Sequence, residues 1–397
     1  MIKILVAPDS FKESLSASQA AQAIQAGILQ AAKYHSVKAQ VHCIPMADGG
    51  EGTLECLAHS TQCELLPCST VNALGQAITA QWAWLPEQAT AFIEMASAAG
   101  LQQIPPTERN ILQATTYGVG LLIKDALNHP LKRLVLCLGG SATNDAGLGM
   151  LEALGIQFLD EQGQSIHAIK PSDIARIRSI NKQLLDPRLQ ELEIILAADV
   201  QNPLYGPQGA AYIFAPQKGA SPEQVKRLDQ DLMSLADLVQ NCLGHDYSQL
   251  AGAGAAGGLG FAALSFFQAQ MISGISLLAE YSQLAQHIAQ ADVVITGEGS
   301  IDAQTLQGKT LAGIAQLCRA HNKPLIALAG RLQEGYQQLY EQGLTAAFSL
   351  NPGGISHEQS LEQSARLLQA LSQDVMALYI SATQHLDTGQ LGNKKDN

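Results

Sequence analysis

The chain opens with two apolar segments separated by an amphipathic stretch. Residues 2–7 form a short apolar run, interrupted only by Lys3, which is typical of a buried strand. Apolar side chains then recur at helical spacing behind a possible capping serine, Ser16 or Ser18. Residues 37–44 alternate between apolar and polar, which predicts a second strand. Residues 1–44 are therefore expected to form a β-α-β unit with parallel strands.

The same alternation of strand and helix returns after residue 291. Apolar runs at 293–296, 324–329 and 344–350 predict three strands, and helical periodicity predicts helices over 311–320 and 358–383. The residues beyond Leu386 are polar and are expected to form a frayed tail, 386–397.

The middle of the chain follows another pattern. Residues 77–84 and 90–95 both read as strands and are separated by a turn, which predicts an antiparallel hairpin. A helix is expected over 110–127, and strands are expected at 134–137 and 193–198. We therefore predict an α/β protein in which residues 1–62 and 288–385 build one parallel-sheet domain. Residues 63–287 would be a mixed α/β domain inserted into it.

Composition indicates a large folded globular protein. The chain has 397 residues, 47% of them hydrophobic and 15% charged, enough for two folded domains. Its net charge of −12 argues against nucleic acid as a partner, although a local site can still be positive. The uncharged stretch 250–278 contains many glycines, so we expect no membrane span. Seven cysteines without a C-x-x-C pair and the lack of a signal-peptide pattern predict a cytoplasmic protein.

The strand predicted at 134–137 leads into a glycine-rich turn. Gly139 and Gly140 are followed by Ser141 and Asn144 and then by a helix-like run. Glycines let a phosphate approach the backbone, and a helix N-terminus favours an anion, so this turn is a candidate phosphate site. Gly147 and Gly149 would lie inside the helix, where each costs about 1 kcal/mol relative to alanine. Tight packing of that helix without any ligand is the alternative interpretation.

Two further loops follow the first two predicted strands. The segment PDSFKES carries Asp9, Ser10 and Lys12, which suit a substrate carboxylate or phosphate. The segment ADGGEGT follows the second strand, and parallel strands place both loops at the same sheet edge, where ligands bind. Its candidate substrate-binding residues are Asp48, Gly49, Gly50, Glu51 and Thr53. The simpler interpretation of both segments is a capped turn.

The loop predicted after the strand at 293–296 reads GEGSID and contains Gly297 and Gly299. Residues 303–310 resemble a P-loop, but a P-loop begins where its strand ends, and here the strand ends earlier. We assign phosphate binding to Gly297 and Gly299, and catalytic roles to Asp302 and Lys309.

Asp199 follows the predicted strand at 193–198, and Asn202 lies three residues on. Carboxylate and amide oxygens suit Mg²⁺, so both are candidate metal ligands, and Asp199 is also a candidate catalytic residue. An Asx-turn is the simpler interpretation. No histidine occurs in these loops, which weakens hydrolase mechanisms and favours phosphoryl transfer.

Five long segments of the chain resemble the bacterial glycerate kinases of the type-1 family. They read APDSFKESLSA, PMADGGEGT, GGSATNDAGLGML, DVQNPLYGPQGAA and ITGEGSIDAQTLQGKT. The resemblance implies phosphorylation of D-glycerate by ATP as co-substrate with Mg²⁺, giving 2-phospho-D-glycerate. It also implies a Rossmann-like domain split by an inserted mixed α/β domain. Because the candidate loops fall in both predicted domains, we expect the active site in the cleft between them.

Two other functions remain open from the sequence. A GHMP-type or sugar-acid kinase is one, because the segment GLGGSAT is similar to the GHMP glycine loop. A non-catalytic metabolite-binding protein is the other, although no output module such as a helix-turn-helix is found. A monomer or a homodimer fits equally well.

Overall fold

The computed structural model describes residues 1–302, 305, 310–351 and 353–392. By contacts between residues, the chain divides into two compact units. The first consists of Met1–Ala47 and Leu278–Asn397, and the second of Asp48–Leu277. Both boundaries therefore fall earlier in the chain than the ones predicted after residues 62 and 287.

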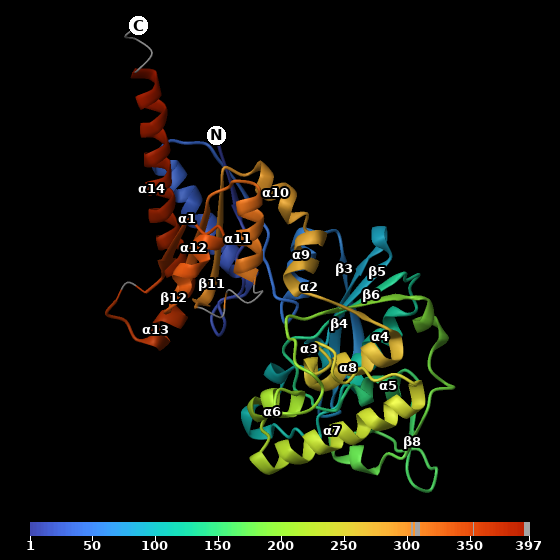
Figure 1. Ribbon diagram of the computed structural model, residues 1–397. Coiled ribbons are helices and arrows are strands. Elements are labelled where there is room, and N and C mark those ends of the chain that lie inside the picture. Colours follow the sequence, from blue (N-terminus) through green and yellow to red (C-terminus); the bar gives the residue numbers. More distant parts are fainter. Residues whose placement is uncertain (303–304, 306–309, 352, 393–397) are drawn as a thin grey trace. The chain divides into compact units, whose positions relative to one another are not determined.

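The first unit is built on a five-stranded parallel sheet (Figure 1). Its order is β13 (Ala346–Ser349), β12 (Leu325–Leu332), β11 (Val293–Ile301), β1 (Ile2–Val6) and β2 (Ala39–Cys43). Strands from both ends of the chain thus share one sheet, as the two similar end segments predicted.

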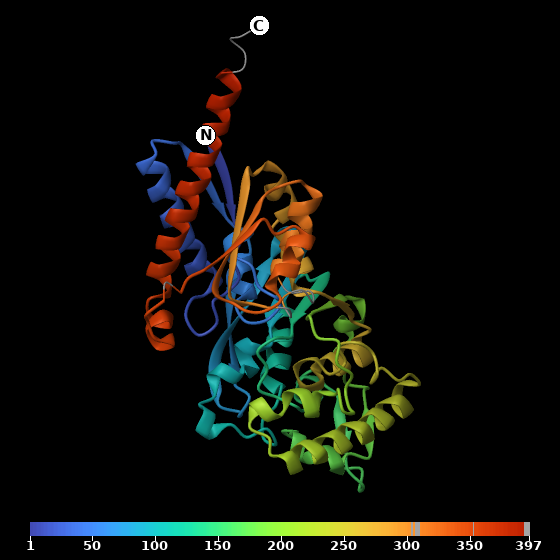
Figure 2. The ribbon, with the colours of Figure 1, turned by 60° about the vertical axis from the view of Figure 1, so that its left-hand side comes forward.

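Helices cover both faces of this sheet (Figure 2). Helices α1 (Ala17–Tyr34) and α14 (Ser364–Gly392) lie on one face, and α10 (Leu284–Gln290) and α11 (Thr310–Ala320) on the other. Ser16 caps α1 in a capping box with Gln19. Gly27 permits close packing, because a Cβ there would lie 2.2 Å from the Gln369 carbonyl oxygen. Two shorter helices, α12 (Leu339–Gln342) and α13 (His357–Glu362), complete this unit.

The second unit is built on a six-stranded mixed sheet. Its order is β10 (Gln270–Ile272), β9 (Glu193–Ala197), β6 (Arg133–Cys137), β5 (Thr90–Glu94), β4 (Ala77–Leu85) and β3 (Glu64–Val71). The predicted hairpin is confirmed as β4 and β5, while β3 and β10 were not predicted. Strands β5, β6, β9 and β10 run parallel, and their last residues pair in register. Four carboxyl ends therefore lie level at one edge of the sheet.

The second unit also contains α-helices and a small two-stranded sheet. The helices are α2 (Thr53–Ser60), α3 (Ala96–Ala99), α4 (Tyr117–Ala126), α5 (Leu148–Ala153), α6 (Ala210–Phe214), α7 (Pro222–Leu243), α8 (Ala255–Phe267) and α9 (Gly274–Tyr281), which continues into the first unit. Strands β7 (Gln157–Leu159) and β8 (Ser179–Asn181) pair antiparallel. The core includes the fully buried Trp82, Phe92, Phe158 and Phe261.

Three predicted elements have different bounds in the structure. Helix α4 begins at Tyr117 instead of residue 110, because Thr116 donates to the buried Asp145 carboxylate instead of continuing a helix. Strand β11 extends to Ile301, so the expected GEGSID loop is largely strand. The helix predicted over 358–383 is divided into α13 and α14, and α14 continues to Gly392. Among the described residues, no helix is long and apolar enough to cross a membrane.

Candidate active site

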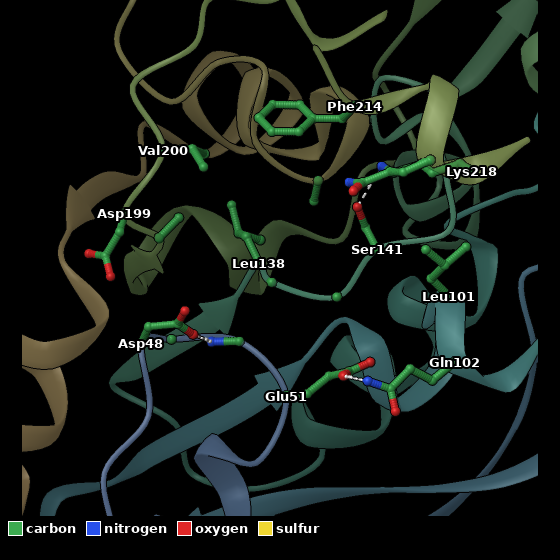
Figure 3. Close-up of a pocket in the computed structure, with 17 residues that line it drawn as sticks. Asp48, Glu51, Leu101, Gln102, Leu138, Ser141, Asp199, Val200, Phe214 and Lys218 are labelled. Atoms are coloured by element: carbon green, nitrogen blue, oxygen red, sulfur yellow. Dashed lines mark hydrogen bonds between the residues drawn. The ribbon is translucent and has the colours of Figure 1, made fainter. Parts of the chain in front are cut away.

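A pocket of about 340 Å³ lies at the level carboxyl edge of the mixed sheet (Figure 3). The segments that follow β6 and β9 line it, together with the loop before α2 and the segment after α6. Its lining residues are Asp48, Gly49, Gly50, Glu51, Leu101, Gln102, Leu138, Gly139, Gly140, Ser141, Ala198, Asp199, Val200, Phe214, Gln217, Lys218 and Ala256. All of them belong to the second unit.

The loop 48–51 is packed directly on the turn after β6. A Cβ on Gly139 would lie 2.4 Å from the Gly50 Cα, and a Cβ on Gly140 would lie 2.7 Å from the Glu51 side chain. Glycine is therefore required for the two backbones to touch. By contacts between residues, Asp48–Thr53 belongs to the same unit as Gly139–Ser141, whereas Asp9–Lys12 belongs to the first unit.

Two carboxylates face one side of the pocket, as Figure 3 shows for Asp48 and Asp199. The Asp48 carboxylate accepts a hydrogen bond from the Gly50 N–H at 3.2 Å. The Asp199 carboxylate accepts one from the Gly274 N–H at 3.2 Å. Gly274 also packs on the backbone of Asp48, where a Cβ would lie 2.0 Å from the carbonyl carbon. The start of α9 thus fixes both acids together.

A buried lysine lies on the opposite side. The Lys218 ammonium donates to the Ser141 hydroxyl and to the Thr143 carbonyl, each at 2.7 Å. Its side chain is 2% exposed, and burial lowers the pKa of Lys218 to about 7, although the nearby Asp145 carboxylate opposes that shift. Lys218 was not predicted from the sequence; the structure places it beside the predicted Ser141.

The glycine turn does not lead directly into a helix as expected. Gly139 and Gly140 are separated from α5 by residues 141–147, and Gly147 precedes the helix with φ 72°. The first N–H groups of α5 are occupied, because Asp145 accepts from Gly147 and Gly149. This helix start is therefore not a phosphate site.

Gly147 and Gly149 serve close packing, the alternative interpretation of this stretch. A Cβ on Gly147 would lie 2.6 Å from the Ala262 Cβ, and one on Gly149 would lie 2.1 Å from the Thr115 hydroxyl. Asn144 is fully buried and does not line the pocket, so its predicted phosphate contact gains no support from the geometry.

Asn202 does not accompany Asp199 into the pocket. Its side-chain amide donates to the Gln208 carbonyl at 2.8 Å, and Asp48 lines the pocket with Asp199 instead. Thr53 lies beneath the loop, fully buried, and its hydroxyl donates to the Gly50 carbonyl at 2.7 Å.

A second group of predicted residues gathers at the carboxyl edge of the five-stranded sheet. The Asp9 carboxylate accepts from the Thr310 hydroxyl at 2.6 Å and from the Ser10 N–H. Asp302 accepts from the Thr305 N–H at 3.1 Å, and Lys12 is exposed. Lys309 lies outside the described residues.

Gly297 and Gly299 belong to β11, where the sequence analysis placed a loop. Their strand pairs with β12, and a Cβ on Gly297 would lie 2.4 Å from the Leu328 carbonyl oxygen. The Gly297 carbonyl accepts from the Asp9 N–H. Gly299 packs against the backbone of Lys12, because a Cβ on Gly299 would lie 3.3 Å from the Lys12 backbone nitrogen. These glycines therefore allow the Asp9–Lys12 loop to rest on the strand.

The pocket thus combines oxygen donors, one cation and a glycine turn. Among the residues that the structure describes, no group of three or more His, Cys, Asp or Glu side chains could hold a metal ion. Mg²⁺ in phosphoryl-transfer sites is usually held by one or two carboxylates, with phosphates and water completing its shell. The pair Asp48 and Asp199 fits that pattern.

Comparison with known proteins identifies the family. A sequence profile described as the glycerate kinase family matches residues 4–380. The chain belongs to the glycerate kinase family. It is therefore a kinase, an enzyme that transfers a phosphoryl group. The match covers both units, which agrees with the resemblance drawn from the five segments.

Individual relatives support the same family. A glycerate kinase of Haemophilus influenzae is 45% identical over 88% of this chain and 91% of its own length. A glycerate 2-kinase of Escherichia coli is 41% identical over 88% of this chain and 90% of its own. The crystal structure of a putative glycerate kinase 2 from Salmonella typhimurium superposes with a TM-score of 0.83 at 39% identity, covering 96% of this chain and 99% of that one. This kinase fold confirms a parallel sheet from the two chain ends with a mixed sheet inserted between them.

Proposed function

We propose that the chain transfers the γ-phosphoryl group of ATP to D-glycerate and that the product is 2-phospho-D-glycerate. The observation that carries this proposal is the family match over residues 4–380. The choice of the 2-hydroxyl is supported by the name of the Escherichia coli relative, glycerate 2-kinase.

The reaction centre is assigned to the pocket around Asp48, Asp199 and Lys218. Mg²⁺ would be held by Asp48 and Asp199, whose hard oxygen donors suit it, and it would neutralise phosphate charge. In this proposal Asp199 keeps the metal-ligand role expected from the sequence, and Asp48 takes the role expected of Asn202.

The other side of the pocket is suited to phosphate. The Gly139–Gly140 backbone lines this side, and Lys218 in its protonated form supplies a buried positive charge whose interaction with a phosphate is strengthened in a low-dielectric site. Ser141 is oriented by its bond from Lys218 and offers a hydroxyl beside that charge. Binding of a phosphate here would stabilise the ammonium form of Lys218.

An ADP-release assay tests the activity directly. Purified protein with Mg²⁺ and ATP is expected to release ADP only when D-glycerate is added, and ³¹P NMR of the product is expected to show a phosphate ester at the 2-position. A 3-phosphate ester would refute the 2-position, and ADP release without glycerate dependence would refute the substrate.

A further inference from the structure

Helix α2 follows the loop 48–51, which lines the pocket, and its N-cap residue provides no side-chain hydrogen bond. Its N-cap is Gly52, with φ 88° and no side chain to accept the orphan N–H groups. The acceptor comes from the end of β5 instead, forty residues along the chain. The Glu94 carboxylate accepts from the Leu54 N–H at 2.7 Å and is also bonded by the Thr53 and Gly52 N–H groups.

Glu94 is an expensive side chain to keep at this position. It is 8% exposed, and no lysine, arginine or histidine forms an ion pair with it among the described residues. Besides the N-terminus of α2, the groups that face it are the Glu51 carboxylate and the Cys137 thiol, neither of which is cationic. An apolar residue would avoid that desolvation cost.

The loop held by this cap is the one that lines the pocket. Thr53 connects the start of α2 to the loop 48–51, since its hydroxyl donates to the Gly50 carbonyl at 2.7 Å. Gly50 lies against Gly139, and Asp48 and Glu51 on either side of the glycine pair both line the pocket. A change at the start of α2 therefore reaches Asp48 through a short, fully packed path.

We propose that ionised Glu94 is a positioning residue, which holds the loop 48–51 in its working geometry by capping helix α2. The inference rests on the proposed function of the pocket. Glu94 does not line the pocket and is given no contact with substrate.

Protonation of Glu94 would weaken this cap. One carboxyl oxygen would then carry a hydrogen and oppose the N–H donors that it now accepts from. Burial raises the pKa of Glu94 to about 7, and the Glu51 carboxylate adds to the shift. Protonation of Glu94 therefore occurs in a pH range in which activity can be measured. Activity is thus expected to fall as the pH drops below about 7.

The test compares Glu94→Gln with the wild type in kcat/KM for glycerate between pH 6 and 8.5. Glutamine keeps the size and one acceptor oxygen but not the charge, so the variant is expected to lose at least about tenfold at pH 8. Its acid-side decline is expected to be flatter than that of the wild type. Since both proteins meet the same substrate ionisation, the difference between the two curves reports Glu94.

Glu152→Gln is the matched control. Glu152 also accepts two backbone N–H groups, from Ala168 and Ile169, in a segment that does not line the pocket. Its pH curve is expected to coincide with that of the wild type. If Glu94→Gln also coincides with the wild type, the inference is wrong. If the wild type itself shows no glycerate-dependent turnover, the proposed function fails instead.

Hydrogen exchange of the wild type provides a second test that needs no variant. After correction for intrinsic rates, protection at the start of α2, taken relative to that of the core strand β6, is expected to fall between pH 8 and pH 6. An unchanged ratio of α2 to β6 protection at the two pH values would overturn the proposal, whatever the folding behaviour of Glu94→Gln.

Discussion

At the scale of single residues, the pocket sets the Asp48 and Asp199 carboxylates against the buried Lys218 amine. Asp199 is held by the N-terminal turn of α9, and Lys218 is held by an acceptor hydroxyl and a carbonyl. Each group is fixed before a ligand arrives. Preorganised charges of this kind are usually the largest single contribution to catalysis.

Asp199→Asn is expected to remain folded and to lose at least about 100-fold in kcat/KM, because the amide cannot supply an anionic metal ligand. Steady-state kinetics across a Mg²⁺ titration, with circular dichroism as a folding check, measures this. Asp160→Asn is the control, since Asp160 only caps a surface turn. Near wild-type turnover at limiting Mg²⁺ would reduce Asp199 to a turn residue.

Lys218 predicts proton uptake on ligand binding. With its pKa lowered to about 7 by burial, the amine is largely neutral at pH 8, and an anion in the pocket would favour its protonated form. Calorimetry of Mg-ATP binding at pH 8, in buffers of different ionisation enthalpy, is expected to show uptake that Lys218→Met abolishes. Unchanged uptake in Lys218→Met would place the phosphate elsewhere.

Glu94 predicts an unusual pH dependence of stability. Folding raises the pKa of Glu94 from 4.5 to about 7, so the folded protein binds more protons than the unfolded chain between these values. The stability contributed by this residue is full below pH 4.5 and is lost as the pH rises to 7, by roughly 3 kcal/mol. Urea unfolding should therefore show that the free energy of unfolding of Glu94→Gln increases relative to that of the wild type from pH 5 to pH 8. A constant difference would contradict the shift.

At the scale of elements, the site depends on backbones that touch. The turn after β6 and the loop before α2 meet at Gly139 and Gly50, with no side chain between them. The packing leaves the loop little freedom to move as long as α2 is capped. This contact couples two segments that lie about ninety residues apart in the sequence.

Gly139→Ala is expected to displace the loop 48–51. Its Cβ would lie 2.4 Å from the Gly50 Cα, and overpacking of this kind costs about 1–3 kcal/mol. We expect kcat/KM to fall at least about tenfold while most of the fold survives. Gly163→Ala serves as a control, because it has φ 72° but no neighbour within 4 Å, so only backbone strain is introduced. Equal activity in the two variants would show that the Gly139 contact is unimportant.

Sequence periodicity predicted most elements because their apolar patterns are local. The strands at both chain ends and the β4–β5 hairpin were found in this way. Contacts between distant segments were not predictable: Glu94 caps a helix forty residues away, and Asp48 joins Asp199 through the start of α9. A charged residue ending the buried strand β5 was the one available signal for Glu94.

The glycine-rich segment also shows where prediction from the sequence ends. A glycine motif fits a phosphate site and a packing contact equally well, and only the neighbours decide between them. Gly139 and Gly140 line the pocket and also pack against Gly50 and Glu51, whereas Gly147 and Gly149 do not line the pocket and pack against other elements of the core. The catalytic roles assigned to Asp302 and Lys309 stay predictions.

At the scale of the whole molecule, the family match extends over both units. Residues 4–380 include the parallel sheet of the chain ends as well as the mixed sheet that carries the pocket. Each unit has its own hydrophobic core. The activity is accordingly assigned to the full chain, and it should be measured on the full chain.

The most direct measurement is ADP release by the intact protein with Mg-ATP, with and without D-glycerate, followed by ³¹P NMR of the product. We predict glycerate-dependent turnover that gives 2-phospho-D-glycerate and that falls sharply in Asp199→Asn. Absence of glycerate-dependent ADP release from folded protein that still binds ATP would contradict the account.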